Sequence, residues 1–298
     1  MNENQLNARF GTPGRIVFKR GLAGYPEVII ANKYGAAKIA LLGANVLSYR
    51  PTGHSEVIFT PRKQDHNRAD SFHGGIPLCW PMFGNRLTKD LPQHGFARKM
   101  VFGVRGVEYS EEMTEVTLYL SSDDETLKLW PHEFDLEVKI SVSMKLNLKV
   151  TTLNTGDKPF TFSCGFHPYF LLRERNDSVV RGLGGMEFFD GMKGVEGKPI
   201  EGDLKLDFSP DNIYSLPDVA KHEFAVVDSG LKRAIAIVSS GNDRAVVWNP
   251  GAENKLPDLE DDDWRRFICV EPVSDWPGGR TLKPDESYSL TAAIQATI

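Results

Sequence analysis

A long alternation of apolar and polar residues constrains the fold of this chain most. Every even-numbered position from Leu136 to Val150 is apolar. A period of two is typical of strands that bury one face. Typical strands have about 5–6 residues, so this run is too long for a single strand. We expect a hairpin with a two-residue turn near its middle that preserves the parity.

Similar strand patterns recur along the chain, and turn-forming clusters such as NTGDKP and SSGND separate them. Helical patterning is limited to a short segment at 122–130, which has an acidic first turn. No linker, repeat or βαβ alternation divides the 298 residues. We therefore predict one all-β domain over 1–298, a large antiparallel β-sandwich with few short helices. The other predicted strands are 115–120, 159–164, 234–239, 245–248 and 287–298.

Charge and composition exclude several classes of partner. The formal net charge of -5 disfavours binding to nucleic acid or to an anionic membrane. The first fifteen residues contain no apolar core, so we expect no secretory signal. Cys79, Cys164 and Cys269 form no CxxC pair, and we expect buried free thiols in a reducing cytoplasm. We interpret the acidic run 259–266 as a solvated loop and expect no metal site.

Two glycine- and proline-marked segments are candidates for a ligand cleft. Residues 74–87 combine glycines, prolines and aromatics, and predict a rigid loop in which Trp80 stacks on a sugar ring; a packed structural loop is the alternative. In 91–99, His94 precedes Gly95 and is followed by Arg98. A structural role for this histidine stays open.

Two further segments carry candidates for proton transfer. His167 ends an alternating strand just before Pro168, and a structural role is again the alternative. Glu271 lies inside an apolar run, where an unpaired carboxylate is costly. Burial raises the pKa of such a group and makes it a better proton acceptor near neutral pH. The alternative is that Glu271 pairs with a core arginine.

These segments together resemble the aldose 1-epimerase superfamily, most closely its hexose-6-phosphate mutarotase branch. The resemblance extends from the strands near Tyr25 to the end of the chain, and its motifs occur in the expected order. They are GGIPLCWPMFG, LPQHGFAR, HPYF, VVWNP and CVEP. The resemblance implies a galactose mutarotase-like supersandwich, which agrees with the period-two prediction. It also implies a monomer that needs no metal, nicotinamide or nucleotide cofactor.

The resemblance also implies roles for individual residues. Glu271 of CVEP corresponds to the base that takes the anomeric hydroxyl proton, and His167 of HPYF to the acid that protonates the ring oxygen. His94 and Arg86 would hold the sugar. Asp211, in the segment DNIY, would line the pocket, although a turn residue after Pro210 is the alternative.

The resemblance implies a sugar or a sugar phosphate as the small-molecule partner. The phosphate-specific branch often has arginine where this chain has His73, before GGIP. Arginine binds phosphate oxygens bidentately. Candidates to supply the charge are His73, Arg62, Lys63, Arg68 and Arg98, each of which has a solvated surface role as its alternative. Three other functions stay open: an aldose 1-epimerase of unphosphorylated hexoses, a non-catalytic carbohydrate-binding protein and a glycoside hydrolase.

Overall fold

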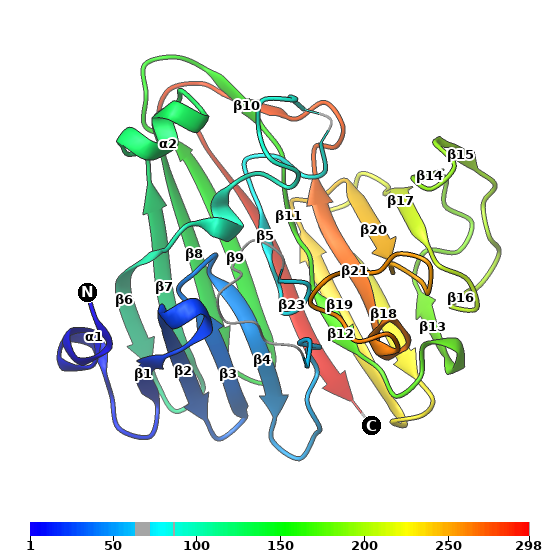
Figure 1. Ribbon diagram of the computed structural model, residues 1–298, viewed down its shortest axis with the longest axis horizontal. Coiled ribbons are helices and arrows are strands. Elements are labelled where there is room, and N and C mark those ends of the chain that lie inside the picture. Colours follow the sequence, from blue (N-terminus) through cyan, green and yellow to red (C-terminus); the bar gives the residue numbers. More distant parts are fainter. Residues whose placement is uncertain (63–71, 86, 298) are drawn as a thin grey trace.

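Antiparallel β-sheets stacked in two layers make up most of the structure, a computed structural model that describes residues 1–62, 72–85 and 87–297 (Figure 1). A nine-stranded sheet forms the back layer. Its strands, in spatial order, are β16 (Leu204–Lys205), β13 (Ser178–Arg181), β18 (His222–Asp228), β19 (Arg233–Ser240), β23 (Ser287–Thr297), β9 (Leu146–Asn154), β8 (Phe134–Val142), β7 (Thr114–Ser121) and β6 (Gly103–Tyr109).

Two sheets lie side by side on the front of this layer (Figure 1). A four-stranded sheet contacts β7 and β8, and an eight-stranded sheet contacts β23. The smaller sheet runs β1 (Ile16–Arg20), β2 (Pro26–Asn32), β3 (Gly35–Ala40) and β4 (Asn45–Pro51). The larger runs β15 (Val195–Gly197), β14 (Phe188–Asp190), β17 (Asp211–Ser215), β20 (Arg244–Trp248), β21 (Phe267–Ser274), β11 (Cys164–Phe166) and β5 (Leu78–Cys79), and β12 (Tyr169–Leu171) also pairs with β21.

Short elements complete the described part of the chain. Strands β10 (Phe160–Phe162) and β22 (Arg280–Leu282) form a small ribbon. No helix among the described residues is long and apolar enough to cross a membrane. The helical elements described are α1 (Glu3–Phe10), α2 (Asp124–Leu129) and the 3-10 turns η1 (Leu22–Gly24), η3 (Ala97–Lys99), η4 (Arg175–Asp177) and η5 (Asp263–Arg266). The all-β sandwich with few short helices is confirmed.

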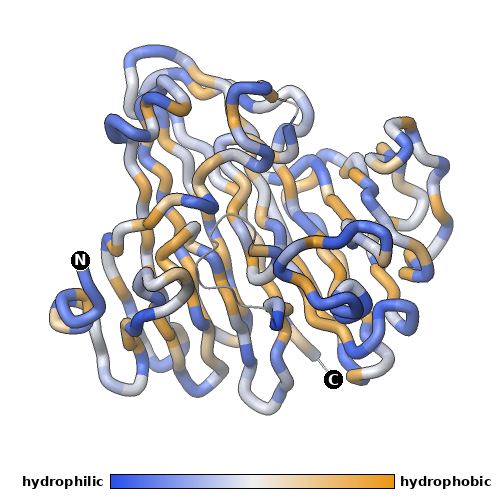
Figure 2. Tube along the Cα trace, viewed as in Figure 1, coloured by the Kyte–Doolittle hydropathy of each residue, from blue (hydrophilic) through white to orange (hydrophobic). Residues whose placement is uncertain are grey.

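The alternating run of the sequence forms strands β8 and β9 of the back sheet. The even-numbered apolar side chains of both strands belong to the core between the layers, and hydropathy alternates along the strands (Figure 2). Met144, in the turn that joins the strands, is exposed. The predicted two-residue turn is wrong: Val142 pairs with Leu146 across a three-residue turn, 143–145. An antiparallel pair joins residues of equal parity only across a loop with an odd number of residues. A three-residue turn therefore keeps the apolar residues of both strands on one face of the sheet, whereas a two-residue turn would not.

The other predicted elements are found with small shifts. The segment 159–164 is divided into β10 and β11 by Ser163, whose hydroxyl accepts a hydrogen bond from the Phe83 N–H at 2.9 Å. The predicted helix at 122–130 is α2, which Asp123 caps by accepting from two backbone N–H groups. Helix α1 was not predicted, although Asn2 and Gln5 form a capping box at its start. The predicted strands 115–120, 234–239, 245–248 and 287–298 correspond to β7, β19, β20 and β23.

Candidate active site

Strand β21 carries Glu271 in the middle of the eight-stranded sheet, and all eight of its residues are buried. Ile268 and Val270 face the main core, whereas Cys269 belongs to a separate cluster on the opposite face. Because side chains alternate along a strand, Glu271 shares the face of Cys269. Only 1% of Glu271 is exposed. The carboxyl group is thus held by a rigid strand on the side of the sheet away from the core.

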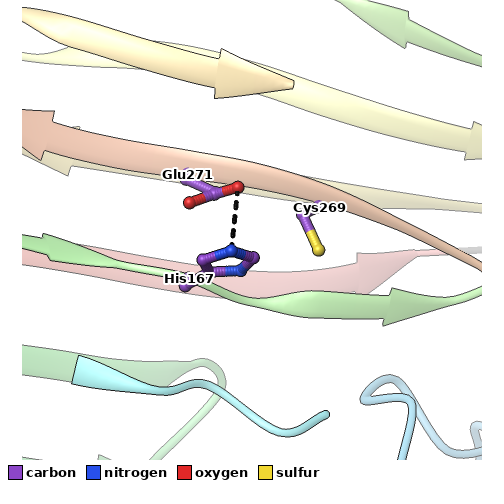
Figure 3. Close-up of side chains that lie close together, drawn as sticks. All are labelled: His167, Cys269 and Glu271. Atoms are coloured by element: carbon purple, nitrogen blue, oxygen red, sulfur yellow. Dashed lines mark ion pairs between the residues drawn. The ribbon is translucent and has the colours of Figure 1, made fainter. Parts of the chain in front are cut away.

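The register of the sheet brings His167 to Glu271. Strand β11 pairs Cys164 with Ser274, and β12 pairs Tyr169 with Cys269. The two short strands share the same pairing register with β21. Position 167 lies in the gap between them and is therefore opposite position 271. The His167 Nε2 lies 3.5 Å from the Glu271 Oε1 (Figure 3). The backbone N–H of His167 donates to the Pro77 carbonyl at 3.0 Å, which holds the gap in place.

Aromatic rings fix the orientation of the His167 imidazole. The Tyr169 ring stacks on it with centroids 4.9 Å apart and planes 13° apart. The Trp248 and His94 rings each meet it edge-on, both with centroids 5.6 Å away. Packed on several sides, the imidazole keeps one orientation toward Glu271.

Three side-chain polar atoms of this pair lack a hydrogen-bond partner in the part of the chain that the structure describes. Among the described residues, the His167 Nδ1 and both Glu271 carboxylate oxygens are buried and unpaired. Burial, reinforced by the negative charge of Asp211, raises the pKa of Glu271 well above its ordinary value. Burial, together with His94, Arg98 and His73, lowers the pKa of His167 well below its ordinary value. The surroundings therefore favour the form in which both side chains are neutral.

The alternative of a core arginine beside Glu271 is excluded for the described arginines. The two buried arginines bond elsewhere: Arg233 donates to the Glu56 carbonyl at 2.7 Å, and Arg175 donates to the Phe208 carbonyl. The carboxyl group of Glu271 is not part of a structural ion pair with either.

His94 faces the pair from a strained turn. Its backbone φ of 64° is left-handed, and Gly95 follows at 70°. A Cβ on Gly95 would lie 2.1 Å from the Trp80 carbonyl oxygen, so only glycine fits there. The His94 Nδ1 accepts from the Gly84 N–H at 3.2 Å. Burial, then Arg98 and His73, lowers the pKa of His94 to about 3, so its ring is neutral and carries its proton on Nε2.

Asp211 and Trp248 share the face of the sheet that carries Glu271. Asp211 pairs with Trp248, and Trp248 pairs with Cys269. Directly paired residues of antiparallel strands point to the same side. Burial and the charge of Asp190 raise the pKa of Asp211. The structure thus brings together four of the predicted residues: Glu271, His167, His94 and Asp211.

The prediction that Trp80 stacks on a sugar is wrong. Its side chain is fully buried in the core, where its ring meets Phe96, Trp130 and Phe134. The indole N–H donates to the Thr152 hydroxyl at 2.9 Å. Trp248, Tyr169 and Cys269 also lie beside the pair and were not predicted as site residues. Their positions in the motifs VVWNP, HPYF and CVEP, on which the resemblance depends, could have identified them as site residues.

The residues predicted to bind phosphate have other contacts. The His73 Nδ1 and backbone N–H bind the Asp258 carboxylate at 2.7 and 2.6 Å. Arg62 lies 3.8 Å from both Asp262 and Asp263. Arg98 donates to the Gln93 carbonyl at 3.0 Å, and its charge lowers the pKa of His94. Arg86, Lys63 and Arg68 lie outside the described residues.

The acidic run 259–266 is only partly the solvated loop predicted. Asp261 and Asp262 are exposed, but Asp263 is fully buried. Its carboxylate accepts from the Glu260 N–H at 3.0 Å and lies 3.5 Å from Arg266. These contacts of Asp263 stabilise the turn.

One group of side chains has donor atoms suited to a metal ion. Nitrogen of His167, sulfur of Cys269 and oxygen of Glu271 all lie within 4.8 Å of one another (Figure 3). Cys79, Cys164 and Cys269 are all free and buried, as predicted. The sulfur of Cys269 is the one of the three that lies in this group.

Known proteins resemble this chain in sequence. The family model described as aldose 1-epimerase matches residues 26–295. A protein of Cenchrus ciliaris, provisionally named glucose-6-phosphate 1-epimerase, is 29% identical over 87% of this chain and 81% of its own. A Salmonella typhimurium protein with the same provisional name is 28% identical over 87% of this chain and 86% of its own.

Solved structures share the fold. The crystal structure of a provisionally named mutarotase (YeaD) from Salmonella typhimurium superposes with a TM-score of 0.87 at 26% identity, covering 99% of this chain and 98% of that one. Galactose 1-epimerase from Lactobacillus acidophilus superposes with a TM-score of 0.74 at 15% identity, over 95% and 98% of the two chains, and shows the fold alone. The family model covers most of the chain, and the chain therefore belongs to the aldose 1-epimerase family, as an isomerase of the epimerase or mutarotase type.

Proposed function

We propose that the protein interconverts the α and β anomers of a hexose 6-phosphate, with glucose 6-phosphate as the first substrate to test. The observation that carries the chemistry is the buried, unpartnered Glu271–His167 pair, with 3.5 Å between Nε2 and Oε1. The provisional names of the relatives support the phosphorylated substrate. The expected cytoplasmic location agrees with three buried free thiols.

The reaction needs two coupled proton transfers. Ionised Glu271 takes the proton of the anomeric hydroxyl, and protonated His167 gives its proton to the ring oxygen as the bond from C1 to that oxygen breaks. Rotation about C1–C2 presents the other face of the aldehyde. Closure then returns both protons to their first positions. Each positioned group contributes a factor of about 10²–10⁴.

Burial of the pair favours the middle of this cycle. The pair is an ion pair while the ring is closed and is neutral while the ring is open. Desolvation raises the pKa of Glu271 and lowers the pKa of His167, and so stabilises the neutral form. The same surroundings that make the charges costly therefore lower the free energy of ring opening.

Neighbouring side chains would hold the sugar. His94 offers its Nε2 proton to a sugar oxygen, and Asp211 accepts from a hydroxyl. Trp248, half-buried on the same face, replaces Trp80 as the aromatic surface for the sugar ring. Arg86, outside the described residues, keeps its predicted role on the sugar hydroxyls.

Saturation-transfer NMR of anomer exchange tests the function. We expect faster exchange for glucose 6-phosphate than for glucose or galactose, and an Arg98→Ala loss that is larger for the phosphate. Equal losses for phosphorylated and free sugars would remove Arg98 from phosphate binding. No acceleration for any of these sugars would favour a carbohydrate-binding role instead.

A second candidate is an epimerase of unphosphorylated hexoses. It is favoured by the contacts of His73 and Arg62 with Asp258, Asp262 and Asp263, because those carboxylates repel an anion. Acceleration limited to glucose or galactose in the same NMR experiment would establish this alternative.

A further inference from the structure

Cys269 lies beside the catalytic pair, and the proposed reaction does not use it. It stands two residues before Glu271 on the same face of β21, and none of its surface is exposed. Figure 3 shows its sulfur on the same side of the strand as the carboxyl and imidazole groups. Its thiol packs in an apolar cluster, and its sulfur can also bind a metal ion, which a small apolar side chain cannot do.

The three side chains form the donor set of a zinc site. Thiolate, imidazole and carboxylate are the ligands that Zn²⁺ takes in proteins, at about 2.0–2.3 Å. Ligand atoms at such distances around a tetrahedral ion lie roughly 3.3–3.8 Å apart. The distance of 3.5 Å between the His167 Nε2 and the Glu271 Oε1 already matches. The Cys269 sulfur lies within 4.8 Å of a His167 ring nitrogen and of a Glu271 carboxylate oxygen, so it must move closer to complete the tetrahedral spacing.

A second observation also indicates a missing ligand. Both carboxylate oxygens of Glu271 are buried without a hydrogen-bond partner among the described residues. Buried carboxylates are normally paired or bound to a metal. A cation between Glu271 and His167 would supply that partner. His167 keeps 9% of its side chain exposed, so the imidazole is not closed off from solvent.

We propose that His167, Cys269 and Glu271 bind Zn²⁺ or a similar thiophilic divalent cation, and that the ion competes with the sugar. The Cys269 sulfur and the Glu271 carboxyl group each form a bond to the metal and release their protons to solvent, and neutral His167 binds through a ring nitrogen, with no change of oxidation state. The metal occupies both proton-transfer groups, so the bound form cannot catalyse mutarotation. The inhibition, but not the binding, rests on the proposed function.

Metal binding is measured on the intact protein with zinc alone and with cadmium alone. Equilibrium dialysis should show one zinc ion per chain, and cadmium should produce the ultraviolet charge-transfer band of a thiolate complex. Loss of a second-sphere metal contact costs about 10–100-fold in affinity. Loss of the sulfur ligand in Cys269→Ala should cost at least about 100-fold, and should abolish the band.

Cys164→Ala is the matched control, because Cys164 is equally buried but lies outside the group. It should keep zinc binding and the cadmium band. Cys269→Ser, which retains the size of the side chain, covers the case in which the alanine variant does not fold. Zinc affinity in folded Cys269→Ala or Cys269→Ser equal to that of the wild type would overturn the proposal, as would a lack of zinc binding by the wild type.

Anomer exchange measured with and without zinc separates the two proposals. We expect zinc to inhibit the wild type and Cys164→Ala at concentrations at least about 100-fold lower than those that inhibit Cys269→Ala. Each protein is compared with its own metal-free rate. If zinc binds but no sugar is accelerated, the proposed function fails and the metal site stands. If sugars are accelerated but zinc does not bind, only the metal site fails.

Discussion

The two faces of strand β21 are equally buried and chemically opposite. Toward the back sheet, Ile268 and Val270 pack in the main apolar core with no exposed surface. On the opposite face, Cys269 and Glu271 are just as inaccessible, but the carboxyl group has no hydrogen-bond partner among the described residues. Burial alone therefore does not separate structural residues from functional ones.

Asn154, at the end of β9, shows what separates them. It is fully buried, and its amide donates to the Lys158 and Leu282 carbonyls at 2.9 and 3.0 Å. Its oxygen accepts from the Gly156 N–H at 3.0 Å. A buried polar group with all its partners stabilises the fold. The Glu271 carboxylate oxygens and the His167 Nδ1 are buried with no hydrogen-bond partner among the described residues, so they are available to a ligand.

The largest effect is expected from Glu271→Gln. Loss of a proton-transfer group should slow anomer exchange by about 10²–10⁴-fold. The free energy of unfolding near pH 7 should not fall. The folded protein raises the pKa of this carboxyl, so the group costs stability once the pH exceeds its unfolded value, and glutamine removes that cost. NMR of anomer exchange and urea unfolding measure the two quantities. A Glu271→Gln variant that keeps its activity, or one that loses stability, would contradict a functional role for this face of β21.

Ile268→Ala tests the other face of the same strand. Loss of this buried side chain should lower the free energy of unfolding by about 2–5 kcal/mol. The milder Ile268→Val should cost about 0.5–1.5 kcal/mol. Urea denaturation gives both values. Anomer exchange per folded molecule should change far less than in Glu271→Gln, and an equal loss would mean that the two faces are not independent.

Asn154→Ala should destabilise the protein by about 1–3 kcal/mol, because it leaves buried backbone groups without partners. Asn147 on the same strand is only half-buried, and its amide contacts are 3.2–3.4 Å long. Asn147→Ala should therefore stay within about 0.5 kcal/mol of the wild type. Urea unfolding measures the stability of both variants. Similar losses of stability would contradict the stabilising role given to the hydrogen bonds of buried Asn154.

His94 predicts a pH dependence of stability. Its pKa is about 3 in the folded protein, against 6.5 as the ordinary value. Between these values the unfolded chain binds more protons, so stability falls as the pH is lowered, by at most about 1.4 kcal/mol per pH unit from this group. His94→Asn keeps a residue that tolerates the left-handed backbone. The free energy of unfolding, measured at pH 7 and pH 5, should fall less in this variant than in the wild type. Equal falls in the two proteins would contradict the burial of a neutral His94 ring.

The sequence predicted the architecture better than the site. Alternation identified strands such as β8, β9 and β19 because one face of each is buried, and the acidic first turn of 122–130 indicated α2. The turn after Val142 was mispredicted because parity across a hairpin depends on loop length. The pairing of the sheets requires contacts between distant segments, which no local pattern records.

Within the site, residue type was more predictable than position. Glu271 in an apolar run, and His167 before a proline, were recognised as candidates from the sequence. Their distance of 3.5 Å depends on the shared register of β11 and β12 along β21. Trp80 and Trp248 both stand just before a proline-containing turn, so the sequence does not distinguish them. Trp80 packs against Trp130 in the core, whereas Trp248 is half-buried on the face of Glu271.

The place of β23 in the back sheet has a consequence for how the protein is made. Strand β23 (Ser287–Thr297) joins two groups of strands, with β19 on one side and β9 on the other. During synthesis, both groups leave the ribosome before the strand that connects them. Until then their open edges can pair with other chains, as unpaired strand edges do in folding intermediates. Translation that stops before Ser287 would therefore yield two half-sheets prone to aggregation, and shielding of those edges by a chaperone would matter most in the last moments of elongation.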